Sequence, residues 1–227
     1  FFEAVYRKGK TINVYGVENT DNKSHALLSG QMKSDYFPVD FSELGADIVS
    51  KPLRASGTDI KGVNVSVLKQ PHPGGCYAFK FTYDGMSAIY ATDCELDLFL
   101  NSGKFGPEER AAEDPSALRI LPEDYIAFFK GADLVILDSQ YSDQEYVDKV
   151  GWGHPRFTTS VDLAVQAEVK RLALFHHDPD HSDSEIDGIV DQARARAKMH
   201  GSNFEIFAAR ESLELRLTNQ EYELPET

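Results

Sequence analysis

Hydrophobic residues in the first half of the chain recur with the two-residue period that is typical of half-buried strands. One helix is expected in this half, over residues 25–32. The dipeptide Asp84-Gly85 separates the last two of these strands, which predicts that they form a β-hairpin. The expected strands cover residues 11–15, 48–53, 63–68, 76–83 and 88–92.

In the second half, predicted strands alternate with predicted helices. Continuous apolar runs at 134–137 and 172–175 predict strands that are buried on both faces. Ser184 is expected to cap the last helix. The expected helices cover residues 122–129, 159–169 and 182–199, and one or two strands are expected within 204–217.

These elements predict a mixed α/β (α+β) domain built from layers of helices and sheet. We take residues 1–227 as a single domain that ends in a polar tail at 218–227. Residues 96–122 are rich in Gly, Pro, Glu and Ala, which predicts a surface excursion with a charged centre at 108–113.

Charge and composition exclude several classes of function. The chain has 23 Lys and Arg against 37 Asp and Glu, a formal charge of −14, so bulk nucleic-acid binding is not expected. A phosphate-containing substrate is still allowed, because bound metal ions reverse the local field. No apolar run approaches the roughly 18 residues that cross a bilayer, so no membrane association is expected. Two cysteines, Cys76 and Cys94, predict packed thiols rather than a disulfide, and hence a reducing, cytoplasmic location.

Residues suited to binding metal follow several of the predicted strands. His176, His177 and His181 lie with Asp178 and Asp180 directly after the strand at 172–175, where α/β proteins place ligands. Imidazole and carboxylate groups at this spacing suit Zn, Mn or Fe. The alternative is a polar loop that precedes a helix.

Four other residues occur in comparable places. His72 lies in a loop of Pro and Gly, Asp93 and Asp138 each end an apolar strand, and His154 follows Gly153 before a helix. An acid that orients an imidazole is a common arrangement for proton transfer, which suggests pairing Asp138 with His154. Each residue alone has a structural alternative as a cap, a turn former or a solvated loop residue. Their common order is more informative than any one of them.

In that order, the chain resembles the metallo-β-lactamase-fold hydrolases, in particular their ribonuclease Z-like and phosphodiesterase branch, over nearly its whole length. In that family, a His in a Pro/Gly loop, an Asp ending a Tyr-x-Thr-Asp strand and a His ending a Leu-x-Leu-x-His strand ligate two metal ions. The matches here are His72, Asp93 and His176, with Asp93 as the bridging carboxylate. The resemblance implies an αββα sandwich with two divalent ions, Zn before Mn or Fe.

The resemblance also implies roles for residues that are not primary ligands. His154 matches the family's Gly-His before a helix and would donate a proton to, or stabilise, the leaving oxygen. Asp138 would support it, where the ribonuclease Z branch has a Glu with a longer reach. His177 and His181 would be neighbours of the site, and Cys94 would pack rather than bind metal.

The family's most specific motif, His-x-His-x-Asp-His, does not occur in these 227 residues. The opening residues 1–6 resemble the segment that follows this motif, and the chain begins with Phe rather than Met. We therefore expect the motif and the N-terminal strands of the sandwich to lie before Phe1. A protein that truly began at Phe1 would expose apolar sheet surface and tend to associate.

The sequence thus favours a metal-dependent hydrolase, specifically a phosphodiesterase that acts on a small molecule such as a cyclic nucleotide. The chain shows no basic, Gly-rich arm of the kind that grips transfer RNA. Two alternatives stay open: a metal-poor relative that binds a ligand without catalysis, and a thioester or lactone hydrolase of the same fold. A homodimer is a common expectation for this resemblance.

Overall fold

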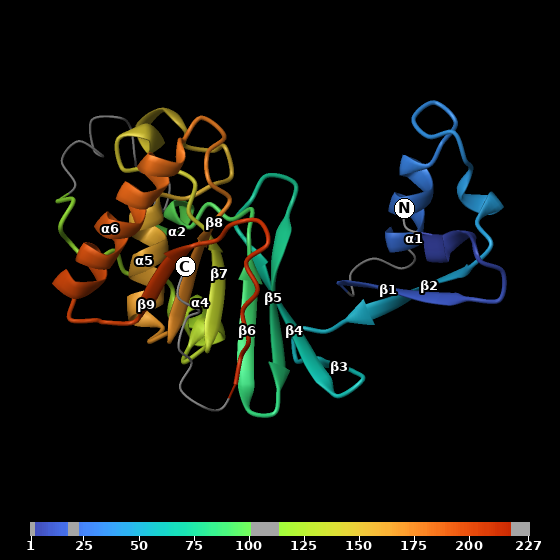
Figure 1. The fold of residues 1–227 in the computed structure, drawn as a ribbon, viewed down its shortest axis with the longest axis horizontal. Helices are drawn as coiled ribbons and strands as arrows, with labels where there is room; N and C mark the ends of the chain where they lie inside the picture. The colour runs from blue at the N-terminus through green and yellow to red at the C-terminus, as the bar shows by residue number, and fades with distance from the viewer. Residues whose placement is uncertain (1–2, 18–22, 101–113, 219–227) are drawn as a thin grey trace. The chain divides into compact units, whose positions relative to one another are not determined.

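The computed structural model describes residues 3–17, 23–100 and 114–218. These residues fall into two compact units (Figure 1). The first unit takes in residues 1–59 with 65–67, and the second takes in residues 60–64 with 68–227. In the described residues, no helix is both long and apolar enough to cross a membrane.

The first unit is built on a pair of parallel strands. Strand β1 (Thr11–Val17) pairs with β2 (Asp47–Leu53), in a register that runs from Thr11 opposite Asp47 to Val17 opposite Leu53. Helix α1 (Lys23–Gln31) lies between them in the chain. The two strands and the helix confirm the sequence prediction, with ends shifted by up to two residues. Short 3-10 helices cover Glu3–Tyr6 and Phe41–Glu43.

The second unit contains most of a seven-stranded sheet, in the order β3-β4-β5-β6-β7-β8-β9. Its strands β5 and β6 form the predicted hairpin, with Phe79 opposite Tyr90 and Tyr83 opposite Met86. Asp84 and Gly85 both have positive φ, 48° and 76°, as a two-residue hairpin turn requires. The strands are β3 (Thr58–Ile60), β4 (Val63–Gln70), β5 (Cys76–Tyr83), β6 (Met86–Ala91), β7 (Leu134–Asp138), β8 (Arg171–Phe175) and β9 (Glu205–Ala208).

Strands β6 to β9 run parallel to one another, so their carboxyl ends meet at one edge of the sheet. Their connections contain helices, as parallel strands need. Figure 1 shows α5 and α6 side by side next to β7, β8 and β9, and the two helices contact each other and these strands. The helices of this unit are α2 (Asp97–Leu100), α4 (Glu123–Phe129), α5 (Phe157–Gln166) and α6 (Asp183–Met199).

The core lies between this sheet and its helices. Ile89, Leu137, Leu172 and Leu174 are fully buried on the strands and pack in one cluster with Val161 of α5. Removing a buried Leu or Ile to Ala costs about 2–5 kcal/mol, so this cluster sets the rigidity of the strand ends that follow it. The mixed α/β arrangement predicted from the sequence is confirmed.

Two details differ from the sequence prediction. The cap of α6 is Ser182, not Ser184, because Ser182 and Glu185 form a reciprocal capping box. Within residues 204–217, only Glu205–Ala208 forms a strand, since the chain turns away after Ala209, and Ser212 has a φ of 64°.

The segment predicted as a surface excursion is partly buried. Arg119 and Leu121 are almost inaccessible to solvent, since Arg119 pairs with the carboxylates of Asp143 and Asp162 and Leu121 packs in the hydrophobic core. The predicted charged centre at 108–113 lies outside the described residues.

Candidate functional site

The structure brings all five predicted site residues to the same edge of the sheet in the second unit. Asp93 follows β6, Asp138 ends β7 and His176 follows β8. His72 lies in the loop after β4, and His154 lies in the segment between β7 and α5. Parallel strands all end at the same edge of the sheet, so residues that follow different strands, far apart in the sequence, lie close together here.

Direct contacts join the five residues. His154 Nδ1 lies 2.7 Å from Asp138 Oδ2, and His176 Nε2 lies 3.3 Å from Asp93 Oδ1. The rings of His154 and His176 stack with centroids 4.5 Å apart, and the ring of His72 lies edge-on to His154 at 5.8 Å. The pairing of Asp138 with His154 expected from the sequence is therefore present.

These atoms form two groups that could each hold a metal ion. One group is His72, Asp93 and His154, and the other is Asp138, His154 and His176, with the ligand atoms of each group within 4.8 Å of one another. His154 belongs to both groups. The three ligands expected from the sequence, His72, Asp93 and His176, are divided between these two groups, although His176 Nε2 lies 3.3 Å from Asp93 Oδ1.

The donor set fits a divalent metal. Imidazole nitrogens and carboxylate oxygens are the ligands that Zn, Mn and Fe share. Asp138 Oδ1 is buried and has no hydrogen-bond partner among the described residues. An ionised carboxylate oxygen without a partner is costly to bury, so this atom is suited to a cation.

Burial and charge shift the pKa values of the Asp138–His154 pair. Burial raises the pKa of Asp138, and the hydrogen bond and charge of His154 only partly oppose this. Burial lowers the pKa of His154, but its hydrogen bond to Asp138 and the charges of Asp138 and Asp93 outweigh burial, so the net shift is upward.

The loop that carries His72 is tied to the end of β6. Gln70 Nε2 donates to the carbonyl of Thr92 at 2.8 Å, and the amide of Glu95 donates to the carbonyl of Pro71 at 2.7 Å. The two contacts hold His72 next to Asp93 and leave the side chains of His72 and Asp93 unused.

Glu95 holds the segment that precedes His154. Its carboxylate is fully buried and accepts three hydrogen bonds: from the hydroxyl of Tyr146 at 2.6 Å, the amide of Gly151 at 2.7 Å and the amide of Gly153 at 2.9 Å. A carboxylate that accepts several strong donors orders the backbone that carries them. Glu95 therefore fixes the position of the backbone directly before His154.

Gly153 also allows His72 to approach. Its φ is 99°, and a Cβ built there would lie 2.6 Å from two ring atoms of His72. Only glycine satisfies both the backbone conformation and the short contact.

Asp97 holds the same segment from its other end. It is buried, and its carboxylate accepts from the backbone amide and guanidinium of Arg156 and from the hydroxyl of Thr159. His154 thus lies between a segment fixed by Glu95 and a residue fixed by Asp97.

The sequence did not reveal the roles of Glu95 and Asp97. Both follow Asp93 at two-residue intervals, and this alternation was the only signal. Side chains two apart face the same way only in an extended chain, and here Asp93 takes a φ of 55° at the end of β6. The turn directs Asp93 toward His176 and the two later acids toward residues 146–156.

The remaining candidates lie beside the groups rather than in them. Cys94 is buried, and its thiol contacts the carbonyl of Ala91 at 3.6 Å, so it packs as expected. His181 Nε2 pairs with Glu145 Oε1 at 2.7 Å. His177 is in neither metal-ligand group, and burial lowers its pKa.

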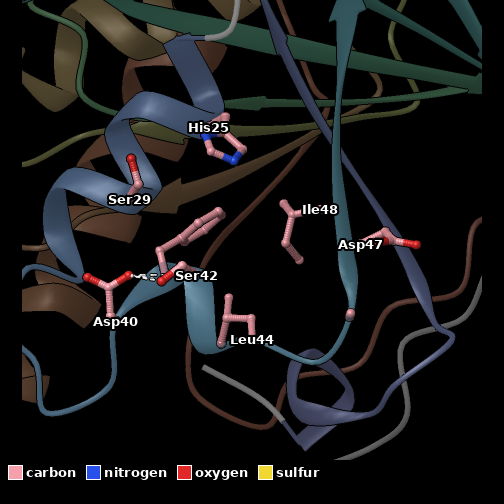
Figure 2. A pocket seen from close by; sticks show the side chains of 9 residues that line it. His25, Ser29, Asp40, Ser42, Leu44, Asp47 and Ile48 are labelled. Atoms are coloured by element: carbon pink, nitrogen blue, oxygen red, sulfur yellow. Dashed lines mark hydrogen bonds between the residues drawn. The ribbon is translucent and has the colours of Figure 1, made fainter.

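The first unit has a hollow of its own, of about 390 Å³, which is lined in part by Phe41 and in which Figure 2 shows His25 above Ile48. The rings of His25 and Phe41 meet edge-on at 4.7 Å. Asp40 caps the backbone by accepting from the amide and hydroxyl of Ser42, and in Figure 2 the Asp47 side chain points away from His25. Among the described residues that line this hollow, the polar side chains therefore do not converge on one point.

Comparisons with known proteins show the fold. No protein-family model matches the chain, and no curated protein sequence matches it. Among solved structures, it is similar to the metallo-β-lactamase fold protein YhfI from Bacillus subtilis, with 15% identity over 88% of this chain and a TM-score of 0.58. A diphosphatase of the PhnP family is 16% identical over 92% of this chain, with a TM-score of 0.54.

Zn²⁺-bound PqqB from Methylobacterium extorquens is 16% identical over 93% of this chain, with a TM-score of 0.55. The chain spans 63%, 60% and 64% of the lengths of YhfI, the diphosphatase and PqqB, respectively. The α/β fold predicted by the sequence resemblance is confirmed: this chain has the metallo-β-lactamase fold.

Proposed function

We propose that this chain belongs to a metal-dependent hydrolase that acts on small phosphodiesters and uses two divalent metal ions. The observation that carries the proposal is the convergence of His72, Asp93, Asp138, His154 and His176 at one sheet edge, in two groups that share His154. The similarity in fold to a diphosphatase and to a Zn²⁺-bound protein supports it.

The two groups would hold the ions through His72 and Asp93 on one side and through Asp138 and His176 on the other. When bound, divalent ions at such a site lower the pKa of a water and offset negative charge on the phosphate. By the sequence resemblance, further ligands come from a His-x-His-x-Asp-His motif, which these 227 residues do not contain.

His154 is the residue placed to move a proton. In hydrolysis, a water gives up a proton as its oxygen bonds to phosphorus, the bond from phosphorus to one ester oxygen breaks, and that ester oxygen takes up a proton and leaves as an alcohol. Asp138 accepts the hydrogen bond from Nδ1 of His154, which leaves Nε2 as the nitrogen that donates the proton to the leaving oxygen. Glu95 and Asp97 keep the ring in this place through the backbone on either side of it.

A small substrate fits the charge of the protein. At −14, the chain repels a long polyanion such as RNA, whereas one phosphodiester group brings a single negative charge to a site with bound cations.

The first test is the metal content and the rate of the full-length protein that contains this chain, with two matched variants. We expect about two equivalents of metal per chain. His176→Ala is expected to lose metal and activity together, whereas His154→Ala keeps metal and loses at least about a hundredfold in rate. Loss of metal from His154→Ala to the same extent would overturn the assignment of His154 as the proton donor and make it a metal ligand, which its place in both groups would then explain. A metal content near zero after metal-replete growth would overturn the proposal.

The second test separates the types of hydrolase. We expect turnover of bis(p-nitrophenyl) phosphate to exceed turnover of a thioester and lactone panel. The reverse order would assign thioester or lactone chemistry to the same site. No turnover of any substrate at full metal loading would favour ligand binding without catalysis.

A further inference from the structure

A hollow of about 300 Å³ opens beside His154 in the second unit. It is formed by residues that follow β7 and β8, so it lies at the same sheet edge as the candidate metal ligands. Its lining consists of Gln140, Tyr141, Lys149, Trp152, His154, Asp178, Pro179 and Asp180.

Gln140 lines this hollow and has a side-chain hydrogen-bond acceptor that is not used by any described residue. The side chain is only 8% exposed, and its Nε2 donates to Asp178 Oδ2 at 3.4 Å. The carboxylate of Asp178 can only accept, which assigns the NH₂ of Gln140 to that side. Gln140 Oε1 is buried and has no partner within the described part of the chain. A buried acceptor without a partner costs about 1–3 kcal/mol, and an incoming N–H or O–H group would remove that cost.

Trp152 offers a flat apolar surface at the same place. Its side chain is 60% exposed, although tryptophan is usually among the better buried residues. The ammonium of Lys149 lies 4.1 Å from the centre of the Trp152 ring and 5.9 Å from that of Tyr141, so it braces the two aromatic side chains. An exposed indole held in this way is suited to stacking against another planar ring.

The charges of the lining decide which part of a substrate enters. Asp178 and Asp180 contribute two carboxylates, and the cations they face are the ammonium of Lys149, which lies over the two aromatic rings, and His154 when it carries its proton. The hollow therefore disfavours a second phosphate group and favours an uncharged group with hydrogen-bond donors.

We propose that this hollow binds a nucleobase, the uncharged planar ring carried by one ester group of the phosphodiester. This proposal rests on the proposed function. The ring stacks on Trp152, and one of its N–H groups donates to Gln140 Oε1. The phosphorus then lies beside His154, and the hollow selects nucleoside esters over simple alkyl esters.

The binding test does not depend on catalysis. Trp152 is the only tryptophan in these 227 residues, so its fluorescence reports directly on stacking. In the full-length protein, we expect adenosine to quench the emission that is lost in Trp152→Phe, and ribose 5-phosphate not to quench it. Quenching by ribose 5-phosphate but not by adenosine would overturn the proposal and assign a phosphate to the hollow.

The contribution of Gln140 is tested with a matched control. Gln140→Leu is expected to weaken adenosine binding roughly fivefold to tenfold, the effect of one lost hydrogen bond. Gln144→Leu changes an exposed glutamine in the same segment that makes no capping hydrogen bond, and should leave binding within twofold. Equal weakening in both variants would contradict a direct contact with Gln140.

The kinetic test uses two esters that release the same p-nitrophenolate. Thymidine 5′-(p-nitrophenyl phosphate) carries a base with an N–H donor, and methyl p-nitrophenyl phosphate carries none. We expect Trp152→Ala to raise KM for the thymidine ester roughly tenfold and to change KM for the methyl ester less than twofold. Equal changes for both esters would overturn the base-binding proposal and leave the hydrolase proposal intact. Hydrolysis of neither ester, with adenosine still quenching Trp152, would overturn the hydrolase proposal alone.

Discussion

Two sets of buried carboxylates contact the segment around His154, and they differ in how completely their oxygens are paired. Asp97 accepts from Arg156 and Thr159 with both oxygens engaged, whereas Asp138 uses one oxygen for His154 and leaves the other without a partner among the residues described. Both carboxylates are fully buried, so exposure to solvent does not explain the difference.

The paired set extends well beyond Asp97. Asp143 accepts from Arg119 and Arg156, and Asp162 accepts from Arg119 and from two nitrogens of Arg196 at 2.7 Å each. Three arginines and three aspartates thus form one network that links α2, α5 and α6 to residues 114–121. The network has the balanced charge of a structural element, whereas the cluster of Asp138 with the histidines has ligand atoms left over for a cation.

The largest expected effect comes from breaking the paired network at Asp162. Asp162→Asn removes the counter-charge of two buried arginines and is expected to cost about 3–5 kcal/mol in the free energy of unfolding, measured in urea. Asp191→Asn is the control, because Asp191 pairs with Arg194 on the surface and should change stability by less than about 0.5 kcal/mol. A loss below about 1 kcal/mol for Asp162→Asn would show that the network does not stabilise the fold.

Glu95→Gln tests the buried carboxylate that holds the backbone preceding His154. The amide retains an acceptor for Tyr146 and Gly151 but places an NH₂ group against the amide of Gly153. We expect a loss of about 1–3 kcal/mol in urea unfolding, together with a lower kcat and little change in KM. Glu123→Gln, on the exposed first turn of α4, is the matched control. A loss of stability with unchanged kcat would show that Glu95 does not position His154.

Gly153→Ala and Gly151→Ala sharpen the comparison by separating backbone strain from contact. Both glycines have positive φ, 99° and 85°, so an alanine at either costs about 1 kcal/mol in backbone strain. Only at 153 would the new methyl group meet His72, and overpacking of that kind costs roughly another 1–3 kcal/mol. Equal stabilities of the two variants in urea would mean that the loop of His72 moves aside without cost.

The smallest expected effect on stability belongs to Asp138→Asn. The change removes a buried carboxylate that is only half paired, and asparagine Oδ1 can still accept from His154, so unfolding free energy should change by less than about 1 kcal/mol. Activity is expected to fall at least about a hundredfold in the same variant, because the negative charge that supports protonated His154, and that would help to hold a cation, is removed. A destabilisation as large as that of Asp162→Asn would erase the distinction between the two sets.

Much of the fold and part of the site could be predicted from the sequence for a simple reason. Asp93, Asp138 and His176 each end a continuous apolar run, and parallel strands bring such ends together. His72 and His154 lie in loops, where hydrophobic periodicity gives no signal; the Pro and Gly around them make them candidates, and the family resemblance gives their roles.

Other features depended on information that local pattern does not carry. Asp93, Glu95 and Asp97 look equivalent in the sequence, and only the turn after β6 shows that they face different neighbours. Arg119 lies in a segment with the composition of a surface loop, and its burial depends on acids from α5 and from the segment after β7. The cap of α6 could have been predicted, because Ser182 and Glu185 have the Ser-x-x-Glu spacing of a capping box, whereas Ser184 is followed at that spacing by Asp187, which is not the Glu or Gln of that motif.

The backbone at two of the site residues has a consequence for how this sequence changes under selection. Asp93 and His176 hold φ values of 55° and 61°, a conformation that glycine and asparagine adopt more easily than aspartate or histidine. A library randomised at these two positions and sorted for folding alone should therefore enrich glycine and asparagine, with a gain of up to about 1 kcal/mol at each position. The same library sorted for turnover should return aspartate and histidine. In descendants of this protein that no longer need its activity, substitutions at positions 93 and 176 would be among the first to accumulate.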